Sequence, residues 1–187
     1  MSTEMQFFDK TAALHRVMVQ HGNAPSALAE VDTLLQDMDV RREFFHTLDN
    51  PEWIVALQNA GYFHNPPAAG RGQKLEPEHP VWPESRYLAR MAPLAPSEVA
   101  NVFAGLQTDN MSIVEDMISA GIAMPAEFSA RLVERVKEAA QTRTSWFPFK
   151  DASDLCVHLA EGKQTDAALT LADSLFTPAF DRGQDEP

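Results

Sequence analysis

Two histidines and two acidic residues lie close together in one segment and could bind a metal ion. His64 and His79 stand near the ends of a Pro- and Gly-rich stretch, residues 62–80, and Glu76 and Glu78 precede the second histidine. Imidazole and carboxylate are both zinc ligands, but the regular ligand spacing of zinc sites is absent here. The other interpretation is a solvated acidic loop whose histidines only titrate. We therefore expect no metal and no cofactor, and keep a metal-dependent enzyme that uses His64 and His79 as an alternative.

The single cysteine is a weak candidate for a nucleophile. Cys156 and His158 are two residues apart in an expected helix, and this spacing turns the two side chains to different faces. We therefore expect Cys156 to be a small, buried apolar residue. The chain also lacks the motifs of P-loop NTPases, HExxH metalloproteases, GxSxG hydrolases and CxxC redox proteins. These observations predict a protein without catalytic activity.

Close pairs of like-charged side chains are the remaining candidates for polar chemistry. Arg86 and Arg90 are four residues apart, so they could form one phosphate-sized site. Alternatively, they could pair with Glu84 or with the last carbonyl groups of a helix. The adjacent carboxylates Glu115 and Asp116 could do acid–base work only if burial separated their pKa values. Because they closely follow inward-facing apolar positions, we expect both to be exposed to solvent.

Large aromatic side chains gather around the same proline-rich segment. Tyr62, Phe63 and Trp82 flank or begin residues 62–80, and Trp146 lies in a second linker. One interpretation is that these rings fill the seams between pairs of helices. The alternative is that some are exposed and bind a protein partner, because Trp and Tyr are enriched at binding hot spots. The candidate partner-binding residues are Tyr62, Phe63, His64, Trp82, Arg86, Arg90 and Trp146.

The elements that position these side chains are expected to be helices, because apolar residues recur at helical spacing and strand patterns are nearly absent. Helices are expected over residues 3–20, 25–38, 40–48, 51–60, 82–91, 97–106, 110–121, 125–141, 151–161 and 165–176. From Arg41 onward they group into two-helix units at about 41–60, 82–106, 110–141 and 150–176. This grouping predicts an all-α fold of antiparallel helix pairs stacked as a short α-solenoid. A compact helical bundle is the alternative.

Length, charge and hydropathy narrow the class of protein further. The chain has 187 residues, and we expect one helical domain over 1–180 followed by a flexible acidic tail at 181–187. A net charge of −12 disfavours direct binding of nucleic acid or of an anionic membrane. A single cysteine excludes an internal disulfide. Since no signal-peptide pattern and no run of ~20 apolar residues is present, we expect a cytoplasmic protein.

Four segments carry a resemblance to a known class of protein. They are EFFHTLDNPEWIVALQNAGYFHNPP (43–67), WPESRYLARMA (82–92), LQTDNMSIVEDMISAGIAMP (106–125) and LVERV (132–136). In this order they resemble the HEAT-like helical-repeat region of very large, poorly characterised bacterial proteins, some associated with phage-defence loci. The resemblance covers about residues 41–176 and consists of packing residues, turns and caps, so it implies an architecture. The NTPase or nuclease modules of those large proteins have no counterpart here, so it implies no activity.

Three functions are compatible with these observations. The first is a non-catalytic scaffold or adaptor for protein–protein interaction within a bacterial defence system. Its recognition surface would combine the concave face of the stacked pairs with residues 62–80. The second is an acidic regulatory or immunity-type protein that binds and neutralises a basic partner. The third is the metal-dependent enzyme at His64 and His79. The repeated helix pairs and the missing catalytic motifs favour the first.

Overall fold

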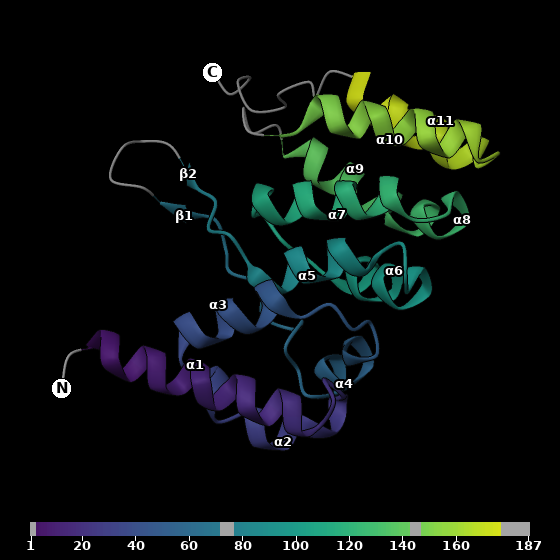
Figure 1. Ribbon diagram of the computed structural model, residues 1–187. Helices are drawn as coiled ribbons and strands as arrows, with labels where there is room; N and C mark the ends of the chain where they lie inside the picture. Colours follow the sequence, from purple (N-terminus) through teal and green to yellow (C-terminus); the bar gives the residue numbers. More distant parts are fainter. Residues whose placement is uncertain (1–2, 72–76, 143–146, 177–187) are drawn as a thin grey trace.

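The computed structural model describes residues 3–71, 77–142 and 147–176, and the regular structure in these ranges is mostly helical (Figure 1). The α-helices are α1 (Thr3–Gln20), α2 (Leu28–Val31), α3 (Met38–Thr47), α4 (Trp53–Asn59), α5 (Pro83–Met91), α6 (Pro96–Gly105), α7 (Met111–Ala123), α8 (Ala126–Ser129), α9 (Val133–Gln141), α10 (Phe149–Glu161) and α11 (Thr165–Phe176). Short 3₁₀ turns occupy Pro25–Ala27, Leu34–Gln36 and Ala130–Leu132. Two strands of two residues each, β1 (Gly70–Arg71) and β2 (Pro77–Glu78), pair in antiparallel fashion.

The helices form two layers that are stacked along the chain. In one layer α3 packs on α5, α5 on α7 and α7 on α10, as Figure 1 shows. In the other layer α4 contacts α6, α6 contacts α8 and α9, and α9 contacts α11. The prediction of an all-α fold is confirmed. The helices lie near the expected two-helix units, but α3 begins earlier, at Met38, and the third unit holds α8 and a 3₁₀ turn besides α7 and α9. A stack of only four pairs is also described well as a compact helical bundle.

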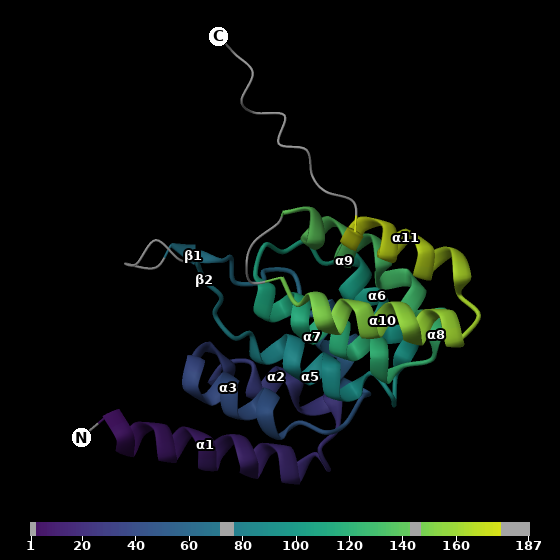
Figure 2. The ribbon, with the colours of Figure 1, turned by 90° about the horizontal axis from the view of Figure 1, so that it is seen from above.

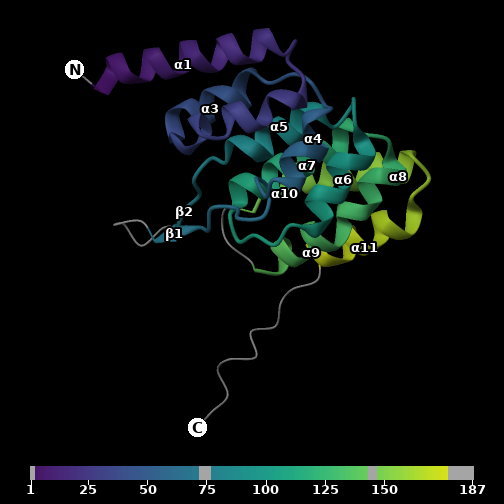
Figure 3. The same cartoon turned by 90° about the horizontal axis from the view of Figure 1, so that it is seen from below.

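The remaining elements lie at the edges of this stack. Helix α1 packs on α2 and α3 at one end. Figures 2 and 3 show α1 at one edge of the molecule, with α9 and α11 toward the opposite edge. The β1–β2 hairpin projects from the side of the stack, away from the helices. The sequence did not predict this hairpin, because two-residue strands are too short to produce an alternating pattern.

Side chains and glycines set the helix ends. The Asp37 carboxylate accepts hydrogen bonds from the backbone N–H groups of Asp39 (3.1 Å) and Val40 (3.4 Å), which caps α3. Gly61 adopts φ +85° directly after α4, a conformation that favours glycine, and it ends that helix as expected. Gly121 was expected to end α7, but the helix continues to Ala123. An added Cβ at Gly121 would lie 3.1 Å from a methyl group of Leu155, so this glycine allows α7 and α10 to pack closely.

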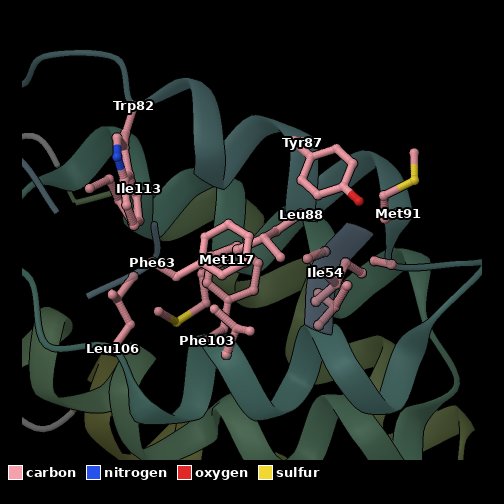
Figure 4. Packing of buried hydrophobic residues seen from close by; sticks show 14 of the residues in the cluster. Ile54, Phe63, Trp82, Tyr87, Leu88, Met91, Phe103, Leu106, Ile113 and Met117 are labelled. Carbon is pink, nitrogen blue, oxygen red and sulfur yellow. The ribbon is translucent and has the colours of Figure 1, made fainter. Parts of the chain in front are cut away.

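The core runs continuously through the stack, as the buried side chains in Figure 4 illustrate. In the α3–α4 unit the rings of Phe44 and Trp53 meet edge to face at 5.2 Å between centroids. The polar atoms of the buried rings are also satisfied. The Trp53 indole donates to Asn23 O (2.8 Å), and the Tyr87 hydroxyl donates to Asn50 O (2.8 Å). Both aromatic side chains therefore join the connecting segments to the helical core.

Two expected helices are interrupted. Residues 25–38 form two 3₁₀ turns around the four-residue α2 instead of one helix. The backbone leaves the helical conformation at Asp37 (φ −82°, ψ 120°), where it caps α3. Residues 125–141 form α8, a 3₁₀ turn and α9. The hydroxyl of Ser129, at the end of α8, donates to Gly121 O at 2.5 Å. The same hydroxyl lies 3.3 Å from Pro125 O, four residues earlier, and side-chain contacts of this kind bend helices.

Candidate interaction surface

A hollow in the described part of the chain lies between α4 and α6. It has a volume of about 580 Å³. Gln58, Phe63, His64, Pro66, Asn101, Val102, Gly105, Leu106 and Gln107 line it, and we call it the α4–α6 groove. The surface that it presents is mostly polar, because the apolar lining residues Phe63, Val102 and Leu106 are almost completely buried; Figure 4 shows two of them close together. Its rim is polar and includes the exposed side chains of His64 and Gln107.

The turn after α4 positions one wall of this groove. Gly61 reverses the chain, and the Tyr62 N–H donates to Leu57 O at 3.0 Å. The His64 N–H then donates to Gly61 O at 3.2 Å. This tight turn directs Phe63 into the core, with 3% of its surface exposed, and leaves His64 exposed at the rim.

Asn110 joins the two described ends of the long loop to the start of α7. Its side-chain oxygen accepts from the Ser112 N–H (3.0 Å) and caps the helix. Its amide nitrogen donates to Pro67 O (3.1 Å) and to Pro80 O (2.8 Å), and the residue is fully buried. The links to the loop could not be foreseen, because Pro67 and Pro80 are far away in the sequence.

The two candidate metal-binding histidines have separate surroundings. His64 lies at the rim of the α4–α6 groove, whereas His79 Nδ1 accepts a hydrogen bond from the Met111 N–H at 3.1 Å. Glu76 and the side chain of Glu78 lie outside the described residues. Within the described residues, no group of three or more His, Cys, Asp or Glu side chains is placed to hold a metal ion. The metal-dependent enzyme at these histidines stays a prediction.

Most of the aromatic side chains named as candidate partner-binding residues are core residues. Tyr62, Phe63 and Trp82 are 9%, 3% and 4% exposed. These rings are almost completely enclosed and offer little surface to a partner, so the structure supports the interpretation that they fill seams between helices. Trp146 lies outside the described residues. The exposed members of the candidate set are His64, Arg86 and Arg90.

Tyr62 belongs to a polar network at the base of α3 and α5. Its hydroxyl donates to Asp32 Oδ1 at 2.6 Å, and the Arg41 guanidinium lies over its ring, 5.1 Å from the centroid. Burial and the Asp32 carboxylate raise the pKa of Tyr62, so the hydroxyl stays protonated. Arg41 also forms an ion pair with the fully buried Glu84. Burial raises the pKa of Glu84, although the Arg41 charge opposes this shift.

A hydrogen bond between Ser85 and Asp116 lies next to this network, and it corrects the expectation that Asp116 is exposed. Glu115 is exposed, as expected, but Asp116 is half-buried and accepts a hydrogen bond from the Ser85 hydroxyl at 2.6 Å. Burial raises the pKa of Asp116, while the hydrogen bond from Ser85 and the charge of Arg86 act in the opposite direction. Asp116 faces inward because α5 and α7 pack tightly together, which the local sequence spacing did not reveal.

The side chains of Ser129 and His158, which the fold brings together, form hydrogen bonds with backbone carbonyl groups. His158 Nε2 lies 2.9 Å from Met124 O and 3.5 Å from Ser129 Oγ. The Ser129 hydroxyl itself donates to Gly121 O, so its proton is directed away from the imidazole. These side chains satisfy carbonyl groups at the end of α7 and do not form a nucleophile–base pair. Cys156 packs against the core, and burial raises the pKa of its thiol, which favours the unreactive form.

Comparison of the chain with family models, with curated proteins and with solved structures finds no match. The proposed function therefore rests on the fold and on the surfaces of the described residues. None of the helices in the described ranges combines the length and the hydrophobicity needed to cross a bilayer. The described residues form a stack of helices with a groove of about 580 Å³ between α4 and α6.

Proposed function

We propose that the chain is a non-catalytic helical scaffold or adaptor in the cytoplasm that binds a protein partner in the α4–α6 groove. The observation that carries the proposal is the groove itself, a hollow of about 580 Å³ whose lining is mostly polar and includes no Asp, Glu, Lys or Arg side chain. Non-obligate protein interfaces are likewise only about as apolar as the rest of a protein surface, and charged residues are depleted at their centre. The groove lies between two successive helix pairs and is walled by the loop after α4, so the stacking itself creates it. The resemblance to HEAT-like arrays of bacterial defence proteins points to the same kind of role and stays a prediction.

A substitution that fills the groove tests this proposal. An added Cβ at Gly105 meets no atom within 4 Å, and the backbone there does not require glycine, so Gly105→Tyr places a ring over the groove without disturbing the core. Ala160→Tyr, on an exposed position of α10, is the matched control. Tagged wild-type protein is purified from its native host, and the co-purifying proteins are identified by mass spectrometry.

The proposal predicts that one stoichiometric partner co-purifies with the wild type and with Ala160→Tyr, and is lost with Gly105→Tyr. A partner retained equally by all three proteins would place the interaction elsewhere. Wild-type protein that purifies with no partner would contradict the scaffold role.

The net charge of −12 favours a second candidate, a regulatory protein that neutralises a basic partner. Association driven by charge weakens steeply as salt is added, because mobile ions screen exposed charges. Association through the groove depends little on salt, because its lining includes no Asp, Glu, Lys or Arg side chain. The dependence of the partner's affinity on ionic strength therefore separates the two candidates.

A further inference from the structure

A group of basic side chains lies between α3 and α5, in the layer of the stack that does not contain α4 and α6. Arg42 and His46 lie four residues apart on α3, and Arg86 and Arg90 have the same spacing on α5. All four side chains line one pocket of about 300 Å³. This clustering is notable in a chain with 27 acidic and 15 basic residues.

The packing of the two helices sets the register that brings these side chains together. Near the start of α5, Glu84 pairs with Arg41 of α3. Near its end, Arg90 Nη2 donates to Phe45 O (2.7 Å) and Leu48 O (2.9 Å) at the end of α3. The two helices therefore run in the same direction, and each basic pair faces the other.

The arginines differ in how far their charge is already engaged. Arg90 is held by the α3 carbonyl groups, which fix its position. Arg42 forms only an exposed ion pair with Asp39 at 3.1 Å, of a kind that contributes little energy. The exposed Arg86 forms no hydrogen bond or ion pair through its guanidinium within the described residues; the half-buried Asp116 acts on it only at longer range. Its hydrogen-bond donors are therefore free for a ligand.

The charge and shape of the pocket define the ligand. Three arginines line the pocket against two carboxylates, that of Glu43 in the lining and that of Asp39, which pairs with Arg42. Positive charge is therefore in excess, and forked guanidinium groups match the oxygens of a phosphate monoester. Val81 and Pro83 form an apolar part of the wall, beside which a small organic group fits. The volume is at the lower end for small-molecule sites.

We propose that the pocket between α3 and α5 binds a phosphate monoester through Arg42, Arg86 and Arg90, with the organic group against Val81 and Pro83. The pocket shares no lining residue with the α4–α6 groove. A test of phosphate binding therefore does not decide whether a protein partner binds the groove. The phosphate monoester could belong to a small metabolite or to a phosphorylated side chain.

Isothermal titration with phenyl phosphate tests the proposal, with benzoate as the singly charged probe of similar size. At fixed low ionic strength we expect saturable binding of phenyl phosphate with a Kd of about 1 mM or tighter. Benzoate should bind about tenfold more weakly. A phosphoserine peptide that binds more tightly than phenyl phosphate would assign the site to a phosphorylated protein, and the reverse order would assign it to a small ester.

Variants locate the binding. Arg86→Gln and Arg42→Gln each remove one exposed donor group and should weaken phenyl phosphate binding by about tenfold or more. Arg16→Gln removes the same charge from an exposed position of α1 and should leave the affinity unchanged. The proposal is overturned if phenyl phosphate does not saturate the protein, if benzoate binds equally well, or if Arg16→Gln weakens binding as much as Arg86→Gln.

Discussion

Replacing Asn110 should destabilise the protein more than replacing any ordinary helix cap, because this one side chain joins α7 to both ends of the long loop. Asn110→Ala removes the acceptor for the Ser112 N–H and the donors to Pro67 O and Pro80 O. The residue is fully buried, so water cannot replace the lost partners without entering the core.

The three hydrogen bonds give the size of the effect. Loss of an N-cap costs about 1 kcal/mol. Each of the two amide–carbonyl hydrogen bonds contributes about 1 kcal/mol more. We therefore expect Asn110→Ala to lower the free energy of unfolding by about 3 kcal/mol. Asp37→Ala, which removes the cap of α3 and an exposed ion pair with Lys10, should cost only about 1 kcal/mol.

Urea denaturation monitored by circular dichroism measures both changes. Asn110→Asp separates the two roles, since it keeps an acceptor for the Ser112 N–H and loses both donors to the loop. We expect it to cost about 2 kcal/mol and to speed hydrogen exchange at the Ala69 amide, which is bonded to Asp109 beside the cap. If Asn110→Ala costs no more than Asp37→Ala, the loop is not held by this side chain and our account of the groove wall is wrong.

Two further predictions concern packing and pH. Gly162→Ala should lower the melting temperature, because the added Cβ would lie 2.1 Å from the Cβ of Ala126. Gly105→Ala should leave the melting temperature unchanged or raise it, because an added Cβ there meets no atom within 4 Å. Equal changes in the melting temperatures of the two variants would contradict the contact between α8 and the end of α10. Burial raises the pKa of Glu84 above its ordinary value of 4.5, so the folded state binds more protons than the unfolded state. The stability that protonated Glu84 contributes is therefore lost as the pH rises through the pKa of Glu84 in the folded state. Glu84→Gln should lack this part of the pH dependence of the free energy of unfolding, and parallel pH profiles for the two proteins would show that Glu84 is not desolvated.

The helical class could be predicted from the sequence because it depends on local periodicity. The helix over Thr3–Gln20 has the expected bounds, and Gly61 ends α4 as its conformational freedom suggests. The interrupted helix at 125–141 was missed, because Ser129 bonds to a carbonyl of the preceding helix, and such a contact leaves no trace in the spacing of apolar residues.

The candidate surfaces were predicted less completely, because each is assembled from segments far apart in the chain. Arg86 and Arg90 were recognised as one possible anion site, but Arg42 and His46 join them only through the register of α3 on α5. Tyr62 and Trp82 were named as candidate contacts for a partner, and the structure buries both. Residue type indicates that an aromatic side chain is important, whereas burial decides whether it serves the core or the surface.

Site-specific photo-crosslinking in the native host tests the central claim, that a protein partner occupies the α4–α6 groove, most directly. A photoreactive amino acid replaces the exposed rim residue Gln107 in one protein and the exposed Ala160 in another. Our account predicts one discrete crosslinked product from position 107 and none from position 160. Crosslinks from position 160 alone, or the same products from both positions, would contradict it.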